Sequence, residues 1–303
     1  MNKIIKTEII NILTDKLNKT VTIDEINKGN DTRLGVIIKD AASNVAPIIY
    51  IDDIKNQPIN NIVDFVLKTY EECLNNNEDI SQFIDTLSNR EDFLESIKIS
   101  VAPKETYDAN NFIVKTINNE IDAYVIMVND IINHNGTRTG KVVVDKTLLN
   151  ALCIDEDTLW KTAAKNTVNK AQLKLLPAIV NEPKEIANWT ILDTNRLISG
   201  NIEDEDYRES VRKMISARIL VLSNKENLHG AGIIYCEDYI KKIIKALSWK
   251  GAWICPSSIH EIILLPYKND SEYDMLKKLV TDVNKTTVDA SEFLSNEPLK
   301  LII

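Results

Sequence analysis

Residues 253–266 read WICPSSIHEIILLP, two apolar runs on either side of a short polar segment. Pro256 cannot donate a ladder hydrogen bond, and serine side chains bond nearby backbone amides, so PSS is typical of a turn. The pattern predicts a β-hairpin whose second strand starts at His260 and Glu261 and runs through Leu265. Because that strand is apolar at nearly every position, we expect both of its faces to be covered.

Two longer stretches predict strands and helices in one repeated order. DAYVIMVND, the turn NHNGTRTG and KVVVD precede the helical KTLLNALCIDEDTLWKTAAKN, and RILVLSN, the turn KENLHG and AGIIY precede the helical CEDYIKKIIKAL. Apolar runs bounded by Gly and Asn turns favour a strand–turn–strand–helix unit in each. We expect these two units to form a C-terminal α+β module over residues 111–303, with a helical linking arm near 166–217.

The first 110 residues predict a separate helix–strand module. Apolar residues recur at three- and four-residue steps through MNKIIKTEIINILTDKL and INNIVDFVLKTYEECL, which is typical of amphipathic helices. TVTIDEIN, RLGVIIKD and VAPIIYIDDI between them are typical of β-strands, and ISQFIDTLSNR predicts a further helix. The fold class we expect is therefore α+β, with modules over residues 1–110 and 111–303.

Composition disfavours several functional classes. The chain has 303 residues, 36 of them Lys or Arg and 45 Asp or Glu, for a formal net charge of −9. Such a surface repels phosphate backbones, and no dense basic run occurs, so we expect no broad nucleic-acid binding. Its apolar runs are too short to cross a bilayer, and its start lacks a signal-peptide core. We expect a cytoplasmic protein without membrane association, with its four cysteines reduced.

Motifs for phosphate binding and ester hydrolysis are incomplete. GTRTGKV, residues 136–142, has three residues between its glycines where a P-loop needs four, and Val142 stands where a Mg²⁺-binding Ser or Thr belongs. HGAG, residues 229–232, resembles an oxyanion-hole loop, but no GxSxG nucleophile elbow occurs in the chain. Both stretches are better explained as close turns, so no cofactor is expected.

A zinc site is the next alternative. His229, Cys236, Cys255 and His260 fall within 32 residues, and two Cys with two His suit Zn²⁺. If HGAGIIYC is a strand, however, His229 and Cys236 lie ~23 Å apart at ~3.3 Å per residue, too far to share one ion. We therefore expect no metal.

PSSIHE holds the remaining candidate for catalysis. Ser258 and His260 would share one strand face with their Cβ atoms ~6–7 Å apart, which is long for proton transfer, and Glu261 would point to the opposite face. HEIIL also carries Leu264 where an HExxH motif requires its second histidine. Turn chemistry explains each residue without further partners. The alternative is a hydrolase-like or metal-assisted enzyme that uses Ser257, Ser258, His260 and Glu261.

The stretches ILVLSNKENLHGAGIIYCEDYIKKI, ICPSSIHEIILLP and EYDMLKKLVTDVNKTTV together resemble an uncharacterised family of bacterial proteins, found mainly in Firmicutes and known only as a domain of unknown function. VAPIIYIDDI and DKTLLNALCIDEDTLWKTAAKNT fit the same family, so the resemblance spans most of the chain. It implies an intracellular bacterial protein of commensal or mobile-element origin. It carries over no activity, substrate or catalytic residue.

The leading interpretation is a non-catalytic intracellular binding protein that acts on a protein partner, because no coherent catalytic or cofactor motif occurs in the chain. An enzyme would be distinguished by a cleft that converges on His260, with a second polar group from outside the hairpin within ~3 Å.

Overall fold

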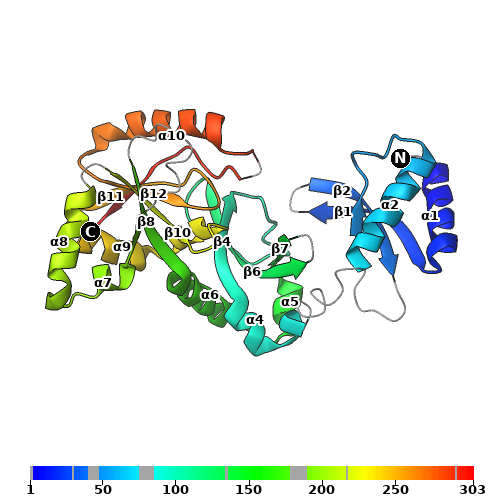
Figure 1. Ribbon diagram of the computed structural model, residues 1–303, viewed down its shortest axis with the longest axis horizontal. Helices are drawn as coiled ribbons and strands as arrows, with labels where there is room; N and C mark the ends of the chain where they lie inside the picture. The colour runs from blue at the N-terminus through cyan, green and yellow to red at the C-terminus, as the bar shows by residue number, and fades with distance from the viewer. Residues whose placement is uncertain are drawn as a thin grey trace. The chain divides into compact units, whose positions relative to one another are not determined.

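A computed structural model describes residues 3–28, 31–39, 48–74, 85–133, 136–177, 190–215, 218–290 and 292–303 of this α+β protein (Figure 1). The chain forms two compact units. Unit 1 comprises Met1–Asp85 and Asp130–Gly140, and unit 2 comprises Thr86–Asn129 and Lys141–Ile303. Within the described ranges, no helix is both long and apolar enough to cross a membrane.

Unit 1 is a three-stranded antiparallel sheet with two helices packed on one face. The sheet order is β1-β2-β3, and Ile9 and Leu13 of the first helix share a core with Val36 and Ile38 of the second strand. The expected strands and both amphipathic helices are confirmed. The elements are α1 (Lys3–Leu17), β1 (Thr20–Lys28), β2 (Asp31–Lys39), β3 (Ile48–Tyr50) and α2 (Ile59–Leu74).

Unit 2 contains a six-stranded antiparallel sheet of order β13-β11-β12-β10-β8-β9 and a smaller sheet in which β4 and β5 flank β6, with β7 also paired to β6. Its helices are α4 (Arg90–Ser96), α5 (Lys146–Ala151), α6 (Glu156–Lys170), α7 (Thr194–Ile198), α8 (Glu205–Ile215), α9 (Glu237–Ala246) and α10 (Tyr273–Thr287), with the 3-10 turns η2 (Ile202–Asp204), η3 (Gly230–Tyr235) and η4 (Asp270–Glu272). Its strands are β4 (Ile97–Pro103), β5 (Val114–Thr116), β6 (Ile121–Asn133), β7 (Gly136–Val143), β8 (Ala171–Pro177), β9 (Thr190–Leu192), β10 (Arg218–Asn224), β11 (Gly251–Cys255), β12 (Ile262–Pro266) and β13 (Leu299–Ile302), of which the end of β6 and the start of β7, within Asp130–Gly140, belong to unit 1.

The hairpin around PSSIHE is present. Strands β11 and β12 pair antiparallel, with Cys255 opposite Ile263. The second strand begins at Ile262 rather than at His260, because the loop before it bonds a different segment. Strand β12 lies between β11 and β10, and Ile262 and Leu264 are buried while the residues after each are half-buried. One face of the strand is therefore fully covered and the other only partly.

The expectation that AGIIY is a strand is wrong. These residues belong to the 3-10 helix η3, so the second strand–turn–strand–helix unit lacks its second strand. A Cβ on Gly232 would lie within 3.0 Å of the Ile99 carbonyl oxygen of β4, a separation that real Cβ atoms essentially never show. The apolar run is buried by this close backbone approach and not by pairing in a sheet.

The segment expected as a helical linking arm, residues 166–217, also differs. It contributes β8, which pairs with β10 along seven residues, because Leu173 and Leu175 are fully buried in the large sheet. The first stretch of unit 1 ends at Asp85. Within unit 2, β4 pairs with β6, and the Thr167 hydroxyl of α6 accepts a hydrogen bond from the Ile99 amide. Residues 75–84, 134–135 and 178–189, which include the first five residues of ISQFIDTLSNR and parts of the expected turn and arm, lie outside the described residues.

Candidate functional site

The loop between β11 and β12 is bonded to the segment that precedes β13. The Ile259 amide donates to the carbonyl of Glu292 at 2.9 Å, and the Leu294 amide donates to the carbonyl of Ser257 at 3.1 Å. The Ser258 hydroxyl accepts from the His260 amide at 3.0 Å, as expected of a serine in a turn. Both serines are buried, so their hydroxyls are not presented to solvent.

His260 uses both of its ring nitrogens within the fold. Its Nδ1 accepts a hydrogen bond from the backbone N–H of His229 at 3.1 Å, so in the neutral ring the proton lies on Nε2. That nitrogen lies 3.3 Å from a carboxylate oxygen of Glu292. The His260 carbonyl also accepts from the Ser223 hydroxyl of β10 at 2.7 Å. The imidazole therefore joins three segments and has no lone pair open to a substrate.

His229 connects this loop to the smaller sheet. It lies in the left-handed region, with φ 54°, immediately before η3. Its Nδ1 is 3.1 Å from the Ser100 hydroxyl oxygen of β4, and that hydroxyl donates to the Tyr124 hydroxyl of β6 at 3.1 Å. We call Ser100, Tyr124, Ser223, His229 and His260 the histidine cluster.

Electrostatics keep His229 neutral. Burial lowers the pKa of His229 to about 3, and the positive charges of Lys141 and Lys98 act in the same direction. Burial likewise raises the pKa of Tyr124, although the Ser100 hydroxyl bond opposes that effect.

The pair of Ser100 and His229 resembles a nucleophile and its base, yet it is not arranged for that chemistry. The Ser100 oxygen lies between the Tyr124 hydroxyl and Nδ1 of His229, and the tautomer of His229 decides which of these atoms donates to it. Ser100 is also 0% exposed, so no substrate carbonyl can reach its oxygen.

The four candidate residues of PSSIHE do not converge on one another. Ser258 contacts His260 through the histidine backbone, and no hydrogen bond among the described residues joins the side chains of Ser257, Ser258, His260 and Glu261. Burial raises the pKa of Glu261, against the opposing charges of His260 and Lys174. The carboxylate beside the imidazole is instead that of Glu292, from outside the hairpin.

The Cys/His set does not form a metal centre in the described part of the chain, where no three His, Cys, Asp or Glu residues are grouped to hold an ion. The separation calculated from a strand at AGIIY does not apply, because that segment is helical. The two cysteines of this set have other surroundings. The Cys236 thiol donates to the Ala164 carbonyl at 3.9 Å, and Cys255 is buried in β11.

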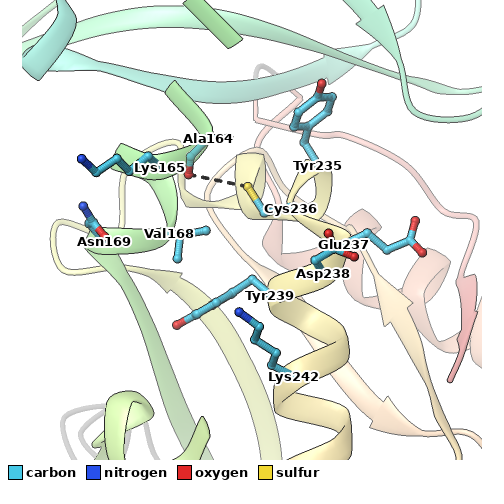
Figure 2. Close-up of a pocket in the computed structure, with 10 residues that line it drawn as sticks. All are labelled: Ala164, Lys165, Val168, Asn169, Tyr235, Cys236, Glu237, Asp238, Tyr239 and Lys242. Carbon is cyan, nitrogen blue, oxygen red and sulfur yellow. Dashed lines mark hydrogen bonds between the residues drawn. The ribbon is translucent and has the colours of Figure 1, made fainter. Parts of the chain in front are cut away.

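A pocket of about 560 Å³ lies between α6 and the start of α9 (Figure 2). Its wall contains the Cys236 thiol, whose pKa burial raises to about 11, and the ring of Tyr239, whose pKa burial also raises. Tyr235 at one end stacks on Trp160 with ring centroids 5.0 Å apart. The lining residues are Ala164, Lys165, Val168, Asn169, Tyr235, Cys236, Glu237, Asp238, Tyr239 and Lys242.

Residues 2–299 match DUF5688, described as a family of unknown function. This chain belongs to that family. The match confirms the resemblance drawn from the sequence and covers nearly the whole chain. No curated protein and no solved structure matches it. DUF5688 brings no catalytic residue or ligand with it, so chemistry has to be argued from the geometry of the site.

Sequence reasoning missed the pocket and the outer members of the histidine cluster. Ser100 lies 129 residues from His229, and Ala164 lies 72 residues from Cys236. One local signal was present: HGAG needs its glycines, since a Cβ on Gly230 would lie within 3.0 Å of the His260 carbonyl oxygen. The two glycines of HGAG were thus a local signal that another backbone, here that of PSSIHE, lies against this segment.

Proposed function

We propose that this chain is a non-catalytic binding protein that holds a small organic ligand in the pocket between α6 and α9. One observation carries the proposal. The pocket is an open cavity of about 560 Å³, within the range of ligand sites, whereas the histidine cluster is closed and uses its own donors and acceptors.

The pocket wall supports binding and not covalent catalysis. Its thiol is Cys236, and a pKa of about 11 keeps that sulfur protonated and poorly nucleophilic at neutral pH. Neither of the two described histidines, His229 and His260, lines the pocket, so the usual general base is missing from the described part of its wall. Val168, Ala164 and the Tyr239 ring supply apolar surface, while lysine and amide groups supply the few polar contacts that orient a ligand.

A cytoplasmic location, expected from the sequence, is part of this proposal. The protein partner expected there is replaced by a small ligand, because a concave site of this size suits a small molecule better than a flat protein surface. The hydrolase-like alternative loses its support, since neither His260 nor Ser100 has the geometry that a base or a nucleophile requires.

The test is a ligand-detected NMR screen of a small fragment library against the full chain. We expect hits on the wild type that disappear in Val168→Trp, whose indole would fill the pocket. Lys161→Trp is the matched control, because Lys161 is exposed on the same helix and does not line the pocket. Hits that persist unchanged in Val168→Trp, or a screen without hits, would overturn the proposal.

A further inference from the structure

We infer that the ligand of this pocket is an organic anion with an apolar body, whose negative group is held by Lys165 of α6 and Lys242 of α9. This inference rests on the proposed function and adds the chemical class of the ligand.

The two lysines lack a counter-ion among the residues that the structure describes. Neither Lys165 nor Lys242 forms an ion pair with another described residue, whereas the neighbouring Lys241 pairs with Glu237 at 2.5 Å and Lys213 pairs with Glu209 at 2.9 Å. Unpaired ammonium groups are ordinary on a basic surface. Here both lysines are exposed, and they lie on the wall of a pocket that mixes apolar and charged residues, in a chain with a formal net charge of −9.

The lining also contains two acidic residues, Glu237 and Asp238. Glu237 forms an ion pair with Lys241, and Figure 2 shows its carboxylate on the other side of Cys236 from Lys165 and Asn169. Asp238 lies in the first turn of α9, where the positive end of the helix dipole favours the ionised carboxylate, so Asp238 keeps its negative charge in the wall. The cap of α9 makes no side-chain hydrogen bond, so its first backbone N–H groups add to the positive potential.

The rest of the wall sets the shape of the ligand. Val168 and the Tyr239 ring present apolar surface between the two helices, and the Asn169 amide lies one helical turn beyond Lys165. A cavity of about 560 Å³ admits an aromatic or branched aliphatic body together with its acidic group. Carboxylates and phosphate monoesters share this chemistry, because both pair with ammonium and amide donors.

The experiment is isothermal titration of the full chain with phenylacetate, phenyl phosphate, phenylacetamide and phenethylamine. We expect at least one of the two anions to bind, and the amide and amine to bind at least about tenfold more weakly, since only the anions gain charge-assisted hydrogen bonds. Preference between phenylacetate and phenyl phosphate assigns the acidic group.

Variants connect that preference to the lysines. Lys165→Gln and Lys242→Gln should each weaken binding of the preferred anion about five- to tenfold and reduce its dependence on salt. Lys161→Gln and Lys245→Gln are matched controls on the same helices, both exposed and outside the lining, and should leave binding unchanged.

The results distinguish failure of the anionic ligand from failure of the proposed binding function. Phenylacetamide binding as tightly as both anions, or lysine variants that bind like the wild type, would overturn the anion and leave the binding pocket in place. If neither anion binds while the fragment screen gives hits that Val168→Trp removes, the anionic ligand is refuted and the binding pocket is retained. A fragment screen without such hits would refute both the anionic ligand and the binding function.

Discussion

The backbone N–H of His229 donates a hydrogen bond to Nδ1 of His260 over 3.1 Å. The two rings also lie with centroids 5.7 Å apart, so the start of η3 and the β11–β12 loop meet through a polar contact in a buried region. A buried amide that loses its acceptor costs more than an ordinary hydrogen bond contributes. The contact therefore predicts a structural role for His260.

His260→Ala should lower the free energy of unfolding by about 1–3 kcal/mol, because it leaves the His229 amide unpaired and removes a packed ring. His260→Asn should cost less, about 1–2 kcal/mol, since its amide oxygen can replace Nδ1 as the acceptor. Urea denaturation of both variants measures the difference. A His260→Ala protein as stable as the wild type would show that the hydrogen bond contributes nothing.

Acid should destabilise the protein through His229. Its pKa is lowered to about 3 in the fold from an ordinary value of 6.5, so the unfolded chain binds a proton at a pH where the folded chain does not. The stability gained from the neutral ring is complete above pH 6.5 and is lost as the pH falls from there towards 3. The loss at pH 5 should be about 2 kcal/mol relative to pH 7.

His229→Asn isolates this effect, because asparagine tolerates the left-handed conformation and does not titrate. The difference in stability between wild type and variant should shrink between pH 7 and pH 5. Parallel pH profiles for the two proteins, measured by thermal denaturation, would contradict the pKa shift of His229.

Gly232→Ala should be strongly destabilising, by about 3 kcal/mol or more, because its new Cβ would overlap the Ile99 carbonyl and force η3 away from β4. Gly200→Ala is the matched comparison. Gly200 has φ +72° but no atom within 4 Å of the added Cβ, so it should cost only the strain of that conformation, about 1–2 kcal/mol. Equal losses for the two, in chemical denaturation, would refute the close approach.

Cysteine reactivity should follow burial. Of Cys153, Cys236 and Cys255, the exposed Cys153 should be alkylated first at pH 8, and Cys236 should react roughly 100-fold more slowly because its pKa of about 11 lowers the thiolate fraction. Cys255, with a pKa of about 12, should be slower still. Mass spectrometry of alkylated peptides gives each rate, and the same peptides from urea-unfolded protein provide the control. Rapid native alkylation of Cys236 would contradict its burial.

We propose that the two units unfold independently. Calorimetry should then show two transitions, and Ile38→Ala in unit 1 should lower only one of them while Leu222→Ala in unit 2 lowers the other. Both side chains are fully buried, so each substitution should cost about 2–5 kcal/mol within its own unit. A single transition that both variants shift alike would show one cooperative fold.

The local sequence pattern was sufficient to predict a helix, strand or turn where it indicated only one of them. Residues typical of strands predicted β1 and β2, the polar PSS turn predicted the β11–β12 hairpin, and helical spacing predicted α2. AGIIY was ambiguous, because a short apolar run suits a buried strand and a buried helix equally. The deciding fact was the clearance around Gly232, which depends on β4, more than a hundred residues earlier in the chain.

The candidate site was less predictable for the same reason. The walls of the pocket come from two helices, and Lys165 and Lys242 have no sequence relationship that a motif could express. Their shared property is the absence of a counter-ion among described residues, which becomes visible only once the pairs made by Lys241 and Lys213 are known.

Unit 1 consists of two separate stretches of the chain, which limits how the protein can be divided. Because Asp130–Gly140 belongs to that unit together with Met1–Asp85, no cleavage at one peptide bond yields both units intact. A gene fragment that ends near residue 85 would encode unit 1 without its second segment, and the complementary fragment would carry eleven residues that belong elsewhere. Separate production of the units would need a rearranged gene that splices 130–140 behind the first segment, with a short linker closing the gap left in unit 2.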